Sequence, residues 1–237
     1  MTSLPTLRRA LTAPALCLAL LGLAGCGGQE TETPTAETGS CDYPEAATAA
    51  AKEVDPPPAD PPAEPPAEVT LQTDRGDIPL SLDADEAPCT VSSFLSLADQ
   101  GYLDDTTCHR LTTGGLSVLQ CGDPTGTGSG GPGYSFADEL VEQDPRLQQC
   151  TGQVDPTSGA EVCTYSAGTL AMANAGPDTN GSQFFLVYKD SQLPAAYTVF
   201  GRMSAAGLKV VSDIAADGNA ADGVAPKEPV TITGVAD

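Results

Sequence analysis

Short runs in which apolar and polar residues alternate recur through residues 69–237 and predict a mainly β domain there. The first two runs, V-T-L-Q-T at 69–73 and I-P-L-S-L at 78–82, flank the turn residues D-R-G and predict a β-hairpin. The other predicted strands lie near residues 108–111, 117–121, 169–174, 183–188, 197–203 and 229–235.

Two stretches have the period of a helix instead. After Pro88, apolar residues recur at i, i+3, i+4 and i+7, and Gly101 ends the pattern. Ser204 is expected to cap a second helix that runs to about residue 216. Many short strands with two helices predict a closed β-barrel with helices at its ends.

The first 25 residues predict a targeting segment. Arg8 and Arg9 precede an apolar run at 11–23 that is too short to span a membrane as a helix. The following L-A-G-C resembles the lipobox of bacterial lipoproteins, which implies lipidation of Cys26 and removal of residues 1–25. An ordinary signal peptide with a chance cysteine is the alternative. Either way the chain is expected to be extracytoplasmic, and the lipobox places it on the cell membrane through a lipid anchor.

Residues 26–68 are rich in Thr, Glu, Ala and Pro and end in D-P-P-P-A-D-P-P-A-E-P-P-A-E. Such a composition is typical of an extended, semi-stiff tether that buries no core. Cys41 and Tyr43 are exceptions, and they are expected to hold part of the tether down.

The charge of the chain is strongly negative, with 10 Lys+Arg against 32 Asp+Glu and a net charge of −22. Such a surface repels nucleic acid and anionic headgroups, so neither is expected as a partner. The acidity indicates either attraction of basic client proteins or simply a well-solvated surface.

Six cysteines remain after Cys17 and Cys26 are set aside, and an even number in an exported chain predicts disulfides. They are Cys41, Cys89, Cys108, Cys121, Cys150 and Cys163. Fifteen pairings are open, and Cys150–Cys163 is preferred because these two bracket part of a polar surface insertion at about 138–167. A metal site from Cys108, His109 and Cys121 has no C-x-x-C pair or second histidine to support it, so no metal is expected.

The candidate chemistry is concentrated between residues 108 and 134. The sole histidine, His109, stands beside Arg110, and Gln120 follows on the predicted partner strand. The Gly-rich loop at 123–134 lacks the Gly-Lys-Ser/Thr ending of a phosphate-binding loop and precedes no clear helix, so a phosphate cofactor is not expected.

Three motifs resemble one family. The stretch M-A-N-A-G-P-D-T-N-G-S-Q-F-F at 172–185 is nearly identical to a signature of the cyclophilin peptidyl-prolyl isomerases. H-R…Q-C-G-D-P-T-G-T-G-S-G-G-P-G-Y, at 109–134, and Y-T-V-F-G, at 197–201, are similar to two others. The resemblance covers residues 69–237 and implies a closed eight-stranded antiparallel β-barrel capped by two α-helices, with the active site on its outer face.

The resemblance also implies roles for individual residues. Arg110 matches the catalytic arginine, and Gln120 and His109 match the glutamine and the histidine counted with it as catalytic residues. Because the implied reaction transfers no proton, His109 is expected to pack and form hydrogen bonds rather than act as an acid or base. The substrate-binding positions match Val118, Ala173, Asn174, Gln183, Phe185, Leu193 and Tyr197. The segment between Arg110 and Gln120 is two residues longer than the common form, so the usual proline-pocket phenylalanine falls at Ser117. Leu116 can replace it if the register shifts.

The function implied is peptidyl-prolyl cis-trans isomerisation, without a cofactor, on proline-containing segments of exported proteins by a monomer. A non-catalytic proline-peptide-binding or chaperone module of the cell envelope is the alternative, favoured by Ser117. A chiefly structural lipoprotein is a third interpretation, which predicts no peptide binding.

Overall fold

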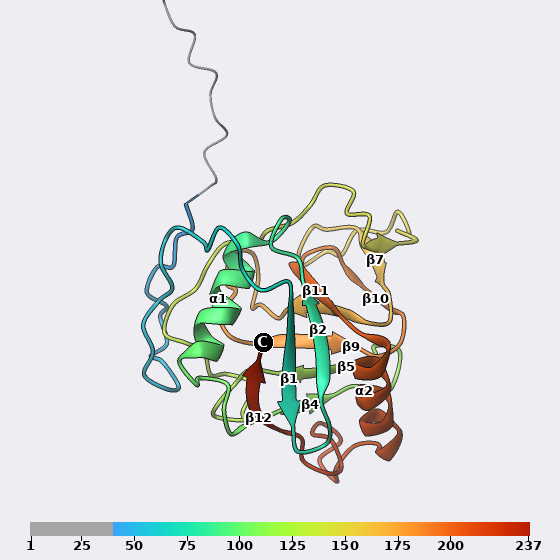
Figure 1. The fold of residues 1–237 in the computed structure, drawn as a ribbon. Helices are drawn as coiled ribbons and strands as arrows, with labels where there is room; N and C mark the ends of the chain where they lie inside the picture. Colours follow the sequence, from blue (N-terminus) through green and yellow to red (C-terminus); the bar gives the residue numbers. More distant parts are fainter. Residues whose placement is uncertain (1–39) are drawn as a thin grey trace, which may run out of the picture. The chain divides into compact units, whose positions relative to one another are not determined.

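The computed structural model describes residues 40–237 (Figure 1). The predicted signal peptide, the lipidation site Cys26 and the first part of the tether lie outside the described residues. The helices are α1 (Pro88–Asp99) and α2 (Ala205–Asp217). The strands are β1 (Glu68–Thr73), β2 (Ile78–Leu82), β3 (Thr106–Thr107), β4 (Arg110–Leu111), β5 (Val118–Cys121), β6 (Leu147–Gln148), β7 (Val162–Tyr165), β8 (Thr169–Met172), β9 (Phe184–Val187), β10 (Ser191–Pro194), β11 (Val199–Met203) and β12 (Thr231–Ala236).

Nine of the strands form one antiparallel sheet in the order β3-β12-β1-β2-β11-β8-β9-β5-β4, and β10-β7-β6 form a second. The predicted mainly β fold with two helices is confirmed. The large sheet is strongly curled, and the closed eight-stranded barrel stays a prediction. The two ends of the strand order are β3 and β4, which are two residues long and follow each other along the chain, separated by Cys108 and His109.

The core fills the concave side of the large sheet, and the two helices lie on either side of strands β1 and β2 (Figure 1). Phe94 of α1 meets Phe184 of β9 edge-on, with ring centroids 5.6 Å apart. Both helices begin as predicted: Pro88 opens α1, and the Ser204 hydroxyl accepts from the Gly207 amide at 3.2 Å. Gly101 follows α1 with a φ of 66°, a conformation that glycine adopts at little cost.

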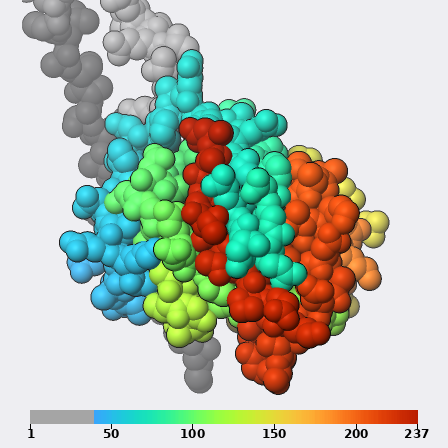
Figure 2. All heavy atoms as spheres, turned by 60° about the horizontal axis from the view of Figure 1, so that its bottom comes forward, coloured from blue at the N-terminus to red at the C-terminus, as the bar shows by residue number. Residues whose placement is uncertain are grey.

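Residues 40–67, expected to be tether, pack on the domain instead. The Cys41–Cys89 disulfide joins them to α1, and the Tyr43 hydroxyl donates to the Cys89 carbonyl at 2.8 Å. The Lys52 ammonium donates to the carbonyls of Gly101 and Tyr102. The segment belongs to the same compact unit as the rest of the described residues, and Figure 2 shows it in blue, lying against the green part of the chain. The expectation that Cys41 and Tyr43 hold the segment down describes it better than an extended spacer does.

The six cysteines form three disulfides: Cys41–Cys89, Cys108–Cys121 and Cys150–Cys163. The pairing preferred from the sequence, Cys150–Cys163, is therefore confirmed. Cys108 and Cys121 are bonded to each other and offer no thiolate to a metal. Three disulfides indicate an oxidising, extracytoplasmic location. Within residues 40–237, no helix combines the length and the apolar character needed to cross a membrane.

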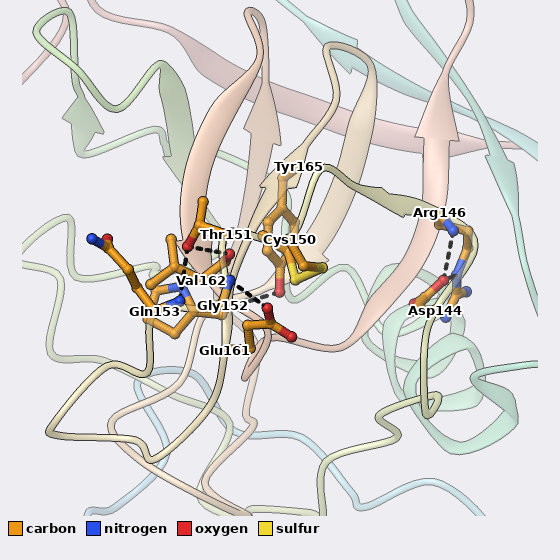
Figure 3. The surroundings of a disulfide bond; sticks show 11 residues. Asp144, Arg146, Cys150, Thr151, Gly152, Gln153, Glu161, Val162 and Tyr165 are labelled. Carbon is orange, nitrogen blue, oxygen red and sulfur yellow. Dashed lines mark hydrogen bonds and ion pairs between the residues drawn. A yellow bond between two sulfur atoms is a disulfide. The ribbon is translucent and has the colours of Figure 1, made fainter.

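The region at 138–167 is less of a pure surface insertion than predicted. Its middle is exposed around Cys150, where Gly152 donates to the Glu161 carboxylate at 2.6 Å (Figure 3). Its ends enter the fold: Tyr165 is fully buried, and Arg146 binds Asp144 and Asp83. Strand β7 pairs with β10, so this region supports the strand that carries Leu193.

We expect the double substitution Cys41→Ser, Cys89→Ser to lower the free energy of unfolding by about 2–4 kcal/mol. The bond closes a loop of 48 residues, so its loss frees much more of the unfolded chain than loss of Cys150–Cys163, which closes 13. The matched pair Cys150→Ser, Cys163→Ser should cost about 1 kcal/mol less in the chain-entropy model. Urea unfolding of both variants measures the difference, and equal losses would contradict the expected dependence on loop length.

Candidate active site

A cavity of about 180 Å³ lies on the face of the large sheet opposite the core. We call it the small cavity. It is lined by Arg110, Leu116, Val118, Gln120, Ala173, Asn174, Phe185, Leu193 and Tyr197. Eight of these nine were predicted as site residues, and the ninth, Leu116, was named as a replacement for the proline-pocket phenylalanine. The structure therefore brings together most of the residues that the motifs identified.

Strand alternation explains how these side chains reach one face. On β5, Leu119 points into the core while Val118 and Gln120 point to the cavity. On β9, Phe184 points into the core and Phe185 into the cavity. Arg110 pairs with Gln120, and Gln120 with Phe185, so the three lie in register on β4, β5 and β9. The cation, the amide and the ring thus form a row across the sheet.

Arg110 brings an uncompensated charge to this row. Its Nη1 donates to the Gln120 Oε1 at 3.2 Å, and within residues 40–237 it forms no ion pair with a carboxylate. Arg75 and Arg146 do form such pairs. In a chain with so many acidic residues, an exposed arginine without an acidic partner is available to a ligand.

A chain of hydrogen bonds holds the Gln120 side chain in place beside Arg110. The Gln120 amide donates to the Gln183 Oε1 at 2.9 Å, and the Gln183 Nε2 donates to the carbonyls of Gly128 and Gly130 at 3.0 and 2.9 Å. In both glutamine side chains the amide oxygen accepts and the amide nitrogen donates, so the donors run in one direction from Arg110 to the Gly-rich loop. Gln183 thus positions Gln120 from the Gly-rich loop, and it does not line the small cavity.

The Gly-rich loop itself is organised by one carboxylate. Asp123 is fully buried and accepts from the amides of Thr125, Gly128 and Gly130. Burial alone raises the pKa of Asp123, but the hydrogen bonds from Thr125, Gly130 and Gly128 outweigh it and hold the pKa below its usual value. A Cβ on Gly130 would lie 2.0 Å from the Asp123 Oδ1, so the loop needs glycine there. The loop uses its amides internally rather than presenting them to a phosphate.

Aromatic side chains pack against one another in the apolar wall of the small cavity. The Phe185 ring is 5% exposed and meets Tyr197 edge-on, with centroids 5.6 Å apart. Tyr165 lies behind both rings, and its hydroxyl donates to the carbonyls of Pro194 and Tyr197, each at 3.2 Å. Aromatic contacts of this kind favour a single arrangement of the recess.

Leu116, rather than Ser117, faces the small cavity. Ser117 is 7% exposed, and its amide donates to the Ser191 Oγ at 2.9 Å. It lines a different hollow with Tyr188 and Asp190. Leu116 thus lines the small cavity, while Ser117, the position found by counting back from Gln120, lies outside it.

Asp138 was missed by the sequence reasoning. Its Oδ1 accepts from the Asn174 Nδ2 at 3.2 Å and from the Asn180 Nδ2 at 2.8 Å. The Asn174 amide also donates to the Ala196 carbonyl at 2.9 Å, so its side chain is held on two sides. No motif pointed to Asp138, because it lies at the start of the region taken for a surface insertion.

His109 is beside the site but does not line the small cavity. Its ring packs on the Gly-rich loop, where a Cβ on Gly128 would lie 3.3 Å from the His109 Cδ2. Within the described residues both ring nitrogens are buried without a hydrogen-bond partner. His109 therefore packs as expected, but the hydrogen bonds expected of its ring are absent among the described residues.

Burial lowers the pKa of His109 below 6.5, and this predicts a specific pH dependence of stability. The unfolded chain then binds a proton more readily than the folded one, so the free energy of unfolding should fall as the pH drops below 6.5. His109 is the only histidine, so unfolding curves between about pH 7 and 5.5 isolate it from the carboxylates. In His109→Gln this slope should disappear; a slope that survives would show that another group titrates.

Comparisons with known proteins agree with this geometry. Residues 68–236 match the family model "Cyclophilin type peptidyl-prolyl cis-trans isomerase/CLD". The chain is 48% identical over 216 residues to a probable peptidyl-prolyl cis-trans isomerase B of Mycobacterium tuberculosis (strain CDC 1551 / Oshkosh), covering 85% of this chain and 65% of that protein. It is 49% identical over 192 residues to the protein of the same name in Mycobacterium leprae (strain TN), covering 78% and 61%.

The chain thus spans slightly less than two thirds of the length of these two relatives. Among solved structures, a cyclophilin type peptidyl-prolyl cis-trans isomerase of Cryptosporidium parvum is similar at 29% identity with a TM-score of 0.57. The match covers 72% of this chain and 96% of that one.

Proposed function

Because this chain belongs to the cyclophilin-type peptidyl-prolyl cis-trans isomerase family, we propose that it catalyses cis–trans isomerisation of X-Pro bonds at the small cavity. The observation that carries the proposal is Arg110, an arginine without an acidic partner among the described residues, at the rim of a recess walled by Phe185. A cation beside an apolar recess suits a substrate that is a proline ring on one side and a polar amide on the other.

The reaction requires rotation about an amide bond whose barrier is about 18–20 kcal/mol because resonance keeps the amide planar. As the amide twists, the prolyl nitrogen loses conjugation and gains a lone pair. The Arg110 guanidinium donates a hydrogen bond to that nitrogen and so stabilises the twisted form over both planar isomers. A guanidinium suits this role because it remains charged and presents fixed donors. No proton is transferred, which agrees with the position of His109 outside the cavity.

The neighbouring groups hold the substrate while its amide rotates. The proline ring occupies the recess between Leu116, Phe185 and Leu193. Gln120, positioned by Gln183, and Asn174, positioned by Asp138, lie where they can bind the peptide on either side of the ring. Groups held in place before the substrate arrives need little reorganisation at the transition state.

The substrates proposed are proline-containing segments of exported proteins, in keeping with the three disulfides of this chain. Uncatalysed X-Pro isomerisation takes about tens to hundreds of seconds, long enough to limit folding. The lipobox-like motif at Cys26 supports attachment to the cell membrane through a lipid, and the protein acts there as a monomer.

The test follows cis-to-trans relaxation of an Ala-Pro test peptide, with the chain produced under oxidising conditions so that Cys41–Cys89 forms. Acceleration in proportion to enzyme concentration is the expected result. Peptide binding without acceleration would overturn the proposal in favour of a non-catalytic binding module. That alternative drew on Ser117, and it loses that support because Leu116 occupies the recess instead. Neither binding nor acceleration would leave a structural role.

A further inference from the structure

A second, larger cavity of about 620 Å³ adjoins the small cavity. We call it the large cavity. The two share Gln120, Ala173 and Asn174 as lining residues, so one extended peptide could contact both. Its far side is formed by the Gly-rich loop between Gly128 and Ser135 and by Thr179–Gln183, whose side chains are small or uncharged.

One wall of the large cavity comes from outside the family match, which begins at residue 68. Residues 45–48 line it, and backbone hydrogen bonds hold them against the Gly-rich loop. The Ala46 amide donates to the Gly133 carbonyl and the Ser135 amide to the Pro44 carbonyl, both at 2.9 Å. Just upstream, the Cys41–Cys89 disulfide and the Tyr43 ring secure the segment to α1. This wall is therefore a fixed part of the groove.

Residues 45–48 include Glu45, whose side chain is the only charged one among the described residues that line the large cavity. Among the described residues that line it, Glu45 alone is ionisable at neutral pH. Its carboxylate is exposed and accepts no hydrogen bond and forms no ion pair within residues 40–237. A carboxylate without a partner beside small neutral side chains attracts a cation and repels an anion.

We propose that residues 45–48 extend the substrate site and that Glu45 selects client segments that carry a lysine or arginine near the X-Pro bond. The inference rests on the isomerase function proposed above and names the client chemistry that this site favours. It also gives the acidity of the chain a local consequence: the preference arises at one carboxylate of the groove, not from the surface charge as a whole.

The experiment compares peptides that share an Ala-Pro unit and carry a single Lys, Gln or Glu at each of four flanking positions. Catalytic efficiency, kcat/KM, is measured by a protease-free assay for the wild-type chain, Glu45→Gln and the matched control Glu53→Gln. Glu53 lies in the same docked segment, is exposed, and lines neither cavity. At one flanking position or more, wild type should prefer Lys to Glu by about two- to fivefold, the range of an exposed ion pair.

Glu45→Gln should lower this ratio toward one, while Glu53→Gln should keep the wild-type ratio. Added salt should weaken the wild-type preference. An equal ratio in wild type and Glu45→Gln, or an equal loss in Glu53→Gln, would overturn the inference while leaving the isomerase proposal intact. If no peptide is isomerised faster, the isomerase proposal fails instead, and the two failures are thus distinguishable.

Discussion

Arg110→Ala should lower kcat/KM for X-Pro isomerisation by about 10²–10³-fold, the loss typical of removing one donor aimed at the transition state. The effect should appear mainly in kcat, because Arg110 is proposed to bind the twisted amide and not the planar ones. Stability should change little, since the side chain is exposed and its one side-chain hydrogen bond is to Gln120. The relaxation assay and a thermal melt measure the two quantities on the same sample.

Two control variants make this result specific. Arg110→Lys keeps the charge and loses the planar set of donors, so it should recover only part of the activity. Arg202→Ala removes an exposed arginine of β11 that lines neither cavity, so it should retain wild-type kcat/KM. If Arg110→Ala and Arg202→Ala lose activity equally, the loss reflects the overall charge, and the mechanism at Arg110 is wrong.

The sequence predicted the helices, the strands and most of the site residues, because each of these depends on a short stretch of sequence. Alternation predicted the strand at 117–121, and the long motifs identified Arg110, Asn174 and Phe185. These residues do line one cavity in the structure. Their proposed roles in binding and catalysis come from the resemblance and await the experiments described above.

The features that the sequence did not predict depend on contacts distant along the chain. Residues 40–67 have the composition of a tether, yet one disulfide and the Tyr43 ring dock them on α1. Leu116 lines the small cavity and Ser117 does not, which counting residues back from Gln120 could not show. Asp138 holds Asn174 across 36 residues, so neither position alone indicates the contact.

The lengths of the end strands of the large sheet are a further case. Alternation predicts strands but not where ladders stop, and here β3 and β4 are two residues each. Cys108 and His109 lie between them, and Cys108 turns to bond Cys121. His109 is thereby directed to the Gly-rich loop while Arg110 faces the cavity, so two neighbours that looked like one catalytic pair have separate roles.

Phe184→Ala and Phe185→Ala should separate stability from catalysis on one strand. Phe184 is fully buried in the core against Phe94, so its truncation leaves a cavity there and should cost about 3–5 kcal/mol in the free energy of unfolding. Phe185 lines the small cavity on the opposite face, where water can occupy the space that its ring leaves. Phe185→Ala should therefore cost less stability than Phe184→Ala, as measured by urea unfolding.

For catalysis, Phe185→Ala should have the larger effect of the two substitutions. Phe185 offers the proline ring its main aromatic contact, and loss of about 1.5–3 kcal/mol of apolar burial corresponds to about a ten- to hundredfold fall in kcat/KM. Phe184 touches no substrate in the proposed mechanism, so Phe184→Ala, assayed at a temperature where it is folded, should keep most of its activity. Phe184→Leu serves as a milder variant if the alanine chain does not fold. If Phe185→Ala kept full activity, the contact between Phe185 and the proline ring would be wrong.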